Sequence, residues 1–490
     1  MNWRKLSALA LAGMLLITAC ACSAAPGNTA APQSAQPDTS VSAQTAPPEA
    51  VADEFAYPMQ GDHTIVYWKG LTNSAYNDND VNLPLYQALM ERTGITLEFQ
   101  HPTVGQEEES FNLMLAGGDY PDILEQNYFD EGKLLDDGVI IDLTELYPQY
   151  APNLYQWLLD NPEIDKQTKN DAGQYLMVGF YRPDPLLQVS SGPIVRLDFL
   201  DQLGINPDDV VTIDDWTGLL RRFRDELNIQ YPFSTDGAGN VRRLQYAFET
   251  GYDFFNEDGT VEYGVLRPGY REFLELANLW YTEGLLDPNY SINKKEDLTA
   301  LWLTGKVGLT YGSGGSYIGQ WITAGSEDPN FKTGGLTYPV RNAGDVNQHG
   351  LNVQFDFSNA NGRVSVSSQC QDVEAAMRFL DYGYSEEGHI LYNFGIEGES
   401  FEYVDGSPVY TDRMFNSPEG YNLSTALAFY VRATGSGPFQ QDPGYILQYY
   451  QYDEQKEALN RWAGPTQQHK TTKMPPMSLP PRPERKSAIL

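Results

Sequence analysis

The strongest constraint on the fold of this chain is a strand, helix, strand pattern in residues 64–99. Residues 64–68 are β-branched or aromatic, which predicts a buried strand. Apolar residues then recur at helical spacing over 85–90, Gly94 marks the end of that helix, and residues 95–99 alternate as a second strand. Two strands joined by a helix form a βαβ unit, so the pattern predicts an α/β fold.

The alternation continues along the chain. An acidic first turn at 107–109 predicts a further helix, which ends at 117–118 before a strand at 122–124. Later signals are a strand at 175–180, a capping box at 212–215, a hairpin turn at 258–259, a helix from Pro268 to Gly284 and a strand at 307–311. The pattern predicts an open α/β sheet, with ligands at the carboxyl ends of its strands.

The amino terminus indicates export. Arg4 and Lys5 precede an apolar stretch at 6–19, which is typical of a secretory signal and short for a membrane span. The sequence LITAC at 16–20 resembles the bacterial lipobox, which implies a lipoprotein signal peptide at 1–19 and a diacylglyceryl group on Cys20. Two acyl chains anchor a protein stably, so we expect it at the extracellular face of the cell membrane. Cys22 is a weaker lipid site, and ordinary secretion remains an alternative.

Composition narrows the possible partners. The chain has 32 basic and 66 acidic residues, a formal net charge of −34, so nucleic acid is not an expected partner. Residues 23–56 are rich in Ala, Pro, Gln, Ser and Thr and carry no Lys or Arg. Such a segment buries little apolar surface. We therefore predict that 20–56 is a lipidated cysteine followed by a disordered tether.

Motifs for catalysis, metals and cofactors are not evident. Cys370 has no obvious partner and is expected to be a buried or half-buried thiol, and no pair of histidines has a metal-ligand spacing. The run at 77–80 lacks the glycine and distal glutamate of a calcium loop, so we interpret it as a solvated turn. The run at 312–315 fits no phosphate loop and suggests a tight turn close to a ligand. A glycosidase carboxylate pair remains open, because its separation is spatial.

Several segments together resemble the extracellular solute-binding proteins of family 1, in particular the long lipoprotein branch of Gram-positive bacteria. They are AGGDYPDI at 116–123, RLDFLDQLG at 196–204, WYTEGLL at 280–286, GKVG at 305–308, LDYGYSEEG at 380–388 and NFGIEGES at 393–400. In this order, behind a lipobox, they cover nearly the whole mature chain.

The resemblance implies a periplasmic-binding-protein type II fold, with two α/β lobes joined by a multi-strand hinge. Lobe 1 is expected at 57–176 plus 355–398, and lobe 2 at 177–354 plus 399–490. Relatives usually continue with further helices after the segment 474–483, so the carboxyl end is either a natural end or a truncation or frame shift.

The implied function is that of a substrate-binding lipoprotein of an ABC importer, a monomer without enzymatic activity, metal or cofactor. It would hold a sugar or oligosaccharide in the cleft between the lobes and deliver it to a membrane permease. Alternatives are a peptide or charged-sugar binder, a secreted glycan-degrading lipoprotein and a surface adhesin. Ligand identity, affinity and the cognate permease stay open.

Candidate ligand residues lie on loops that follow strands, or near the hinge. In the first lobe they are Trp68, Lys69, Glu125, Asn127 and Tyr128, and in the second lobe Tyr181, Arg182, Tyr311, Ser313, Phe401 and Tyr403. Aromatic rings would stack on sugar faces, and carboxylates and amides would accept hydroxyl hydrogens. Arg182 could pair with the carboxylate of a charged ligand.

Overall fold

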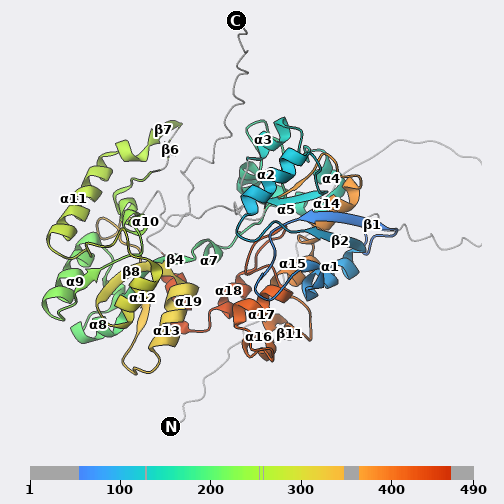
Figure 1. Ribbon diagram of the computed structural model, residues 1–490. Coiled ribbons are helices and arrows are strands. Elements are labelled where there is room, and N and C mark those ends of the chain that lie inside the picture. Colours follow the sequence, from blue (N-terminus) through green and yellow to red (C-terminus); the bar gives the residue numbers. More distant parts are fainter. Residues whose placement is uncertain (1–54, 127–129, 253, 258, 347–362, 465–490) are drawn as a thin grey trace, which may run out of the picture. The chain divides into compact units, whose positions relative to one another are not determined.

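The computed structural model describes residues 55–126, 130–252, 254–257, 259–346 and 363–464. Within these ranges the chain forms two four-stranded sheets and two hairpins among many helices (Figure 1). The α/β class predicted from the sequence is thus confirmed. Cys20, the signal peptide, the tether up to residue 54, Asn127 and Tyr128 lie outside the described residues. No helix in the described part of the chain has the length and apolar character needed to cross a membrane.

The first sheet has the strand order β10, β3, β1, β2. Its strands are β1 (His63–Trp68), β2 (Ile95–Gln100), β3 (Ile123–Gln126) and β10 (Arg363–Val366). β1 pairs in parallel with β2 and β3, and β10 is antiparallel to β3. The helices α1 (Pro84–Thr93) and α2 (Glu107–Gly117) make the two parallel crossovers. The βαβ unit at 64–99 is confirmed, and the carboxyl ends of β1 and β3 share one edge of the sheet.

Both faces of the first sheet are covered. Side chains alternate along a strand, so Ile65 and Tyr67 of β1 join one hydrophobic cluster while Trp68 joins another. The larger cluster contains apolar residues of α1, α4 (Leu146–Tyr150), α5 (Pro152–Asp160), α6 (Pro162–Thr168), α14 (Val373–Tyr382) and α15 (Glu386–Phe394). The smaller one contains Phe111 of α2 and Leu134 of α3 (Glu131–Asp136).

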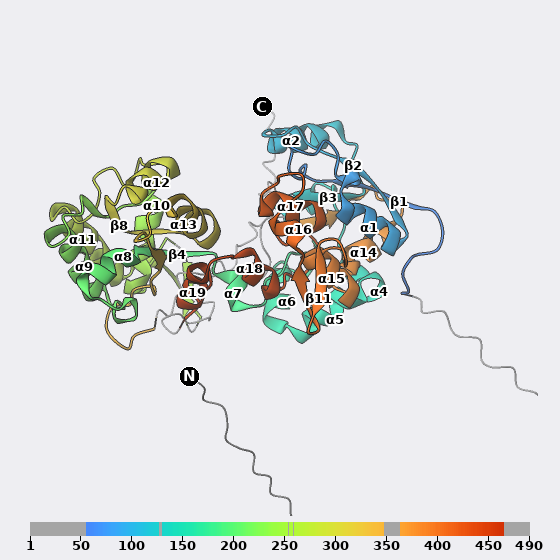
Figure 2. The ribbon, with the colours of Figure 1, turned by 90° about the horizontal axis from the view of Figure 1, so that it is seen from below.

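The second sheet has the order β5, β8, β4, β9. Its strands are β4 (Ser191–Arg196), β5 (Tyr231–Phe233), β8 (Val307–Ser313) and β9 (Thr333–Gly335). Only the β5–β8 pair is parallel. Apolar residues of α8 (Leu197–Leu203), α9 (Ile213–Asp225), α10 (Ala238–Val241), α11 (Pro268–Thr282), α12 (Lys295–Leu303), α13 (Gln320–Gly325) and α19 (Asp453–Trp462) form its hydrophobic cluster with the strands, and both ribbon views show these helices around β8 (Figure 2).

A third apolar cluster lies between residues 394 and 445. It involves the hairpin β11 (Phe401–Val404) and β12 (Ser407–Tyr410) and the helices α16 (Asp412–Phe415), α17 (Leu423–Tyr430) and α18 (Pro443–Tyr449). The predicted limits of the two lobes stay a prediction. The clusters place Val178, Phe180 and Tyr181 with the first sheet and Val189 with the second, on either side of the short helix α7 (Pro185–Gln188).

Several local predictions are confirmed. The capping box at Thr212 is present, β6 (Phe254–Glu257) pairs with β7 (Thr260–Tyr263) around the predicted turn, and α11 begins at Pro268. Two predictions are wrong. Residues 175–180 form isolated bridges, one of them between Val178 and Val364, and no continuous strand.

The glycine run after β8 is the second wrong prediction. Gly312 and Ser313 belong to β8, and Gly314–Gly319 forms a short π-helical turn in place of a tight turn. A Cβ at Gly314 would lie 2.6 Å from the hydroxyl of Tyr450, and Gln455 donates to the Gly314 carbonyl at 2.8 Å. These glycines therefore allow close packing of β8 against the carboxyl-terminal helices.

Candidate functional site

Lys69 and Asp80 form a buried ion pair at the carboxyl end of β1. Lys69 directly follows the strand, and its Nζ contacts the Asp80 carboxylate and donates to Thr72 Oγ1 at 3.0 Å. The Asp80 carboxylate also accepts from Thr72 N at 3.0 Å and from Asn77 Nδ2 at 2.7 Å. Asp80 is completely buried, so the prediction of a solvated turn at 77–80 is wrong for this residue, although Asp78 is exposed.

Burial and pairing act in opposite directions on these two groups. Burial is the largest influence on Asp80 and by itself raises the pKa of the carboxyl group, but the charge of Lys69 and the hydrogen bonds from Lys69 and Thr72 lower it below its usual value. For Lys69, burial and then the charge of Arg432 lower the pKa of the amine, against the opposing effect of Asp80. The pair therefore depends on its mutual contact.

Glu125 and Arg432 form a second buried pair beside the first. Glu125 lies on β3, and its carboxylate accepts from Arg432 Nη2 at 2.6 Å and from the Tyr67 hydroxyl at 2.5 Å. Arg432 follows α17 and donates through Nη1 to the Tyr86 hydroxyl at 2.6 Å. Burial raises the pKa of Glu125, but Arg432 and Lys69 outweigh burial and hold it below the usual value.

The two pairs connect distant segments of the chain to the sheet edge. Lys69 and Asp80 fix the loop between β1 and α1, while Glu125 and Arg432 fix the segment after α17. Breaking a buried pair by removing one partner typically costs about 3–5 kcal/mol, because a charge is left uncompensated. The charges of Lys69 and Glu125 are thus satisfied within the protein.

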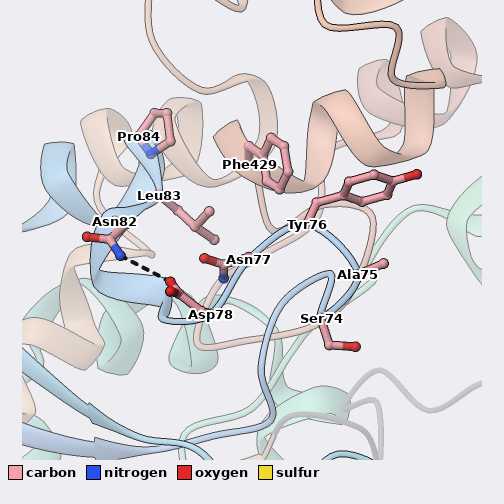
Figure 3. Close-up of a pocket in the computed structure, with 9 residues that line it drawn as sticks. All are labelled: Ser74, Ala75, Tyr76, Asn77, Asp78, Asn82, Leu83, Pro84 and Phe429. Carbon is pink, nitrogen blue, oxygen red and sulfur yellow. Dashed lines mark hydrogen bonds between the residues drawn. The ribbon is translucent and has the colours of Figure 1, made fainter.

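An open pocket of about 630 Å³ lies at the loop that this network holds (Figure 3). Its lining residues come from the loop after β1, the start of α1 and helix α17: Ser74, Ala75, Tyr76, Asn77, Asp78, Asn82, Leu83, Pro84 and Phe429. Asn77 both lines the pocket and donates to Asp80, so the buried network positions a pocket side chain. Hydroxyl, amide, carboxylate and aromatic groups all reach the pocket.

Three aromatic side chains form a chain of contacts at this pocket. The ring centroids of Tyr76 and Tyr421 are 5.1 Å apart, and those of Tyr421 and Phe429 are 5.3 Å apart. Tyr76 is 60% exposed, and Figure 3 shows its ring beside helix α17, which carries Phe429. We call Tyr76, Tyr421 and Phe429 the aromatic wall. It offers flat apolar surface next to the polar side chains of Asn77, Asp78 and Asn82.

The other predicted ligand residues are dispersed. Trp68 is 7% exposed and packs edge-on against Phe111, while Tyr181 is wholly buried with its hydroxyl 3.2 Å from Thr168 Oγ1. Arg182 is half-buried, and its guanidinium lies 5.0 Å from the centre of the Phe180 ring.

The predicted residues farther along the chain also differ in exposure. Tyr311 is buried in the second cluster, and its hydroxyl has no partner among the described residues. Ser313 accepts from Ser316 N at 3.2 Å as a helix cap. Phe401 belongs to the third cluster, and Tyr403 is 49% exposed with its ring against Phe401. Lys69 and Glu125 are therefore the predicted residues that the structure brings to one network.

Sequence reasoning missed Asp80, Arg432 and the aromatic wall. The available signal was the position of residues 70–83 directly after the first parallel strand, where α/β proteins bind ligands. The sequence predicts Asn77 and Asp80 only as part of a turn. Arg432 and Phe429 carry no local signal, because they belong to helix α17 and the segment after it, and Arg432 lies 307 positions after Glu125.

Metal and thiol chemistry receive no support in the described ranges. No group of three or more His, Cys, Asp or Glu side chains there is arranged to hold a metal ion. Cys370 is buried as expected, and burial raises the pKa of its thiol to about 12. A thiol with such a pKa is protonated at neutral pH and is a poor nucleophile.

Comparison with known proteins gives a family match over most of the chain. A family model described as bacterial extracellular solute-binding protein matches residues 79–390. Lipoprotein LipO of Bacillus subtilis is 22% identical over 342 residues, which cover 66% of this chain and 65% of that protein. The fructooligosaccharide ABC transporter substrate-binding protein FusA of Streptococcus pneumoniae is 20% identical over 278 residues, 49% of this chain and 48% of FusA. The chain thus spans just under two thirds and about half of these relatives.

Solved structures share the fold. Alginate-binding protein AlgQ2 without calcium ion superposes with a TM-score of 0.64 at 20% identity, covering 83% of both chains. FusA of S. pneumoniae in complex with kestose gives a TM-score of 0.58 at 19% identity, covering 81% of this chain and 82% of that one. Both are solute-binding proteins, so the predicted type II binding-protein fold is confirmed.

Proposed function

We propose that this chain, which belongs to the family of bacterial extracellular solute-binding proteins, captures a sugar or oligosaccharide and delivers it to the permease of an ABC importer. It binds the sugar without altering it. We also propose that the protein is a monomer that a lipid on Cys20 anchors to the extracellular face of the cell membrane.

The aromatic wall is the observation that carries the proposal. Pyranose and furanose rings present apolar C–H faces that stack on aromatic side chains, and their hydroxyl groups pair with amides and carboxylates. Tyr76 and Phe429 offer such surfaces beside Asn77, Asp78 and Asn82. The pocket opens where the loop leaves β1, which is where α/β proteins place their ligands.

The names of the relatives support a carbohydrate. FusA is a fructooligosaccharide-binding protein and AlgQ2 an alginate-binding protein. Family membership also supports binding without turnover, since these relatives are named for binding and not for a reaction.

Capture also requires closure over the ligand. A solute that contacts both lobes and binds the closed form better shifts the population toward it. We propose Arg182, Ser313 and Tyr403 as further ligand contacts, since the side chains of all three remain partly accessible. Trp68, Tyr181, Tyr311 and Phe401 are buried in apolar clusters, Lys69 is buried in its ion pair, and the Glu125 side chain is only 11% exposed in its own. We propose that these residues shape the site by holding its loops.

A thermal-shift screen of the full chain against mono- and oligosaccharides tests the proposal. A ligand at a hundred times its dissociation constant adds about 2.7 kcal/mol to the stability of the folded state. For a saccharide that stabilises the protein, Tyr76→Ala should lower the affinity by up to about 10-fold, because stacking on the ring contributes about 0.5–1.5 kcal/mol.

Tyr281→Ala is the matched control, since Tyr281 is 51% exposed on α11, outside the pocket. It should leave the shift unchanged. Two results would count against the proposal: no saccharide stabilises the protein, or both variants weaken binding equally. Release of shorter sugars from the ligand would favour the glycan-degrading alternative.

A further inference from the structure

Arg182 is a half-buried arginine that has no carboxylate partner among the described residues. Arg196 pairs with Asp198 at 2.7 Å, and Arg432 pairs with Glu125 at 2.6 Å. Within the described residues, the Arg182 guanidinium takes part in no ion pair and donates no hydrogen bond, and its Nε is buried without a partner. In a chain with 66 acidic and 32 basic residues, carboxylates outnumber cations, yet none of the described ones pairs with Arg182.

The backbone around Arg182 is held on both sides. Tyr181 N donates to Phe439 O at 3.2 Å, and Gln441 N donates to Tyr181 O at 2.9 Å. Gln188 Nε2 donates to the Arg182 carbonyl at 2.7 Å. The residue lies between the last bridge of the first-sheet group and α7, where the chain leaves for the second sheet. Its position is therefore fixed independently of its guanidinium.

The side chain is oriented by an aromatic contact. The guanidinium lies over the Phe180 ring, with its central carbon 5.0 Å from the ring centroid, and this contact does not use the N–H donors. Burial lowers the pKa of Arg182, and Tyr445 acts in the opposite direction without cancelling this effect. A guanidinium stays charged even so, and its buried Nε–H group costs stability as long as it has no acceptor.

We infer that Arg182 is the anion-binding residue of the ligand site and that the preferred solutes are saccharides that carry a carboxylate, such as uronic acid oligomers. The inference rests on the proposed function and narrows it to acidic sugars. The planar fork of arginine matches a carboxylate with two parallel hydrogen bonds, a geometry that a neutral hydroxyl does not provide. An acidic chain gains selectivity in this way, because its net charge of −34 repels anions except where a fixed cation receives them.

Calorimetric titration of the full chain with trigalacturonate and with its carboxyl-reduced, neutral counterpart tests the inference. We expect the acidic trisaccharide to bind more tightly than the neutral one. We also expect added NaCl to lower the affinity for the acidic trisaccharide more than the affinity for the neutral one. Arg182→Gln should lower the affinity for the acidic sugar by about 10- to 100-fold and leave the affinity for the neutral sugar nearly unchanged. Arg182→Lys should give a smaller loss, since it keeps the charge without the fork.

Arg271→Gln is the matched control, because Arg271 is 85% exposed on α11 and pairs only with Glu275. It should bind both sugars as the unchanged chain does. The melting temperature of the unliganded Arg182→Gln protein should stay the same or rise, whereas a structural arginine would lower it.

The outcomes separate the two proposals. If the neutral trisaccharide binds as well as the acidic one, or if Arg182→Gln weakens both equally, the inference is overturned and the proposed function stands. If no saccharide of either kind binds, both fail. Binding of a glutamate-rich peptide in place of the acidic sugar would also overturn the inference.

Discussion

Glu125 and Arg432 are 307 positions apart in the sequence, yet their side chains meet at 2.6 Å in a buried site. Glu125→Gln leaves the Arg432 charge buried and uncompensated. We expect a loss of about 3–5 kcal/mol in the free energy of unfolding, measured by urea denaturation. The double variant Glu125→Gln with Arg432→Met should recover part of that loss, since it removes the stranded charge.

Glu275→Gln is the control for this prediction. Glu275 pairs with Arg271 on the surface of α11, where both side chains are exposed, so its loss should have no measurable effect. Equal effects of Glu125→Gln and Glu275→Gln would show that the buried pair does not hold the sheet edge.

Asp381 makes stability depend on pH. Burial raises its pKa from 3.8 to about 6, against the hydrogen bonds from Leu154 N and Asn153 and the charge of Arg378. The folded state therefore binds more protons than the unfolded state between about pH 4 and 6. Stability from this group is complete below about pH 4 and is lost as the pH rises through about 6.

The expected loss is on the order of 3 kcal/mol, because one pKa unit corresponds to about 1.4 kcal/mol. Urea titrations of the unchanged chain and of Asp381→Asn at pH 4, 5, 6 and 7 measure it. The difference between the two proteins should change across this range and level off above it. A constant difference would contradict the raised pKa.

The sequence predicted the edge where Lys69 and Glu125 lie but not their partners. Both residues follow or occupy parallel strands, and that topology is readable from local periodicity. Which acid or base meets them depends on chain segments that return much later, as Arg432 does. Lys69 and Glu125 were expected to contact a ligand, but in the structure both side chains form ion pairs within the protein.

At the scale of elements, the glycines that end α1 and α2 allow a matched comparison. Gly94 has φ 73° and Gly118 has φ 70°, so both adopt the left-handed conformation. A Cβ at Gly94 would lie 2.6 Å from Met59 O, whereas Gly118 has no atom within 4 Å. Gly118→Ala should cost about 1–2 kcal/mol from backbone strain, and Gly94→Ala clearly more.

Thermal and urea unfolding of the two variants test this difference. Equal losses in the free energy of unfolding would mean that the segment around Met59 moves away from the new Cβ atom without a measurable loss of stability. The comparison isolates the steric contact, because the backbone conformation is nearly the same at both sites.

Elements with strong local signals were predicted well. β1, α1 and β2 follow the predicted order, and α9 begins at its capping box. Residues 175–180 have strand-like composition, but they form two isolated bridges to different segments, Tyr175 with Lys169 and Val178 with Val364, which no periodicity reveals. The glycine run after β8 was mistaken for a ligand turn because the packing of Tyr450 against it is a long-range contact.

At the scale of the whole molecule, each four-stranded sheet has its own hydrophobic cluster, as a two-lobed binding protein requires. The family could be inferred from short segments spread along the sequence, and the family match over 79–390 confirms it. The site could be placed only in part, because its aromatic wall combines a loop after β1 with helix α17.

Isothermal titration of the purified full chain with oligosaccharides, followed by chromatography of the recovered ligand, tests the central claim most directly. We predict saturable binding of one oligosaccharide per chain, with the sugar recovered at its original length. Recovery of shortened sugar, or the absence of binding by every saccharide tried, would contradict the claim.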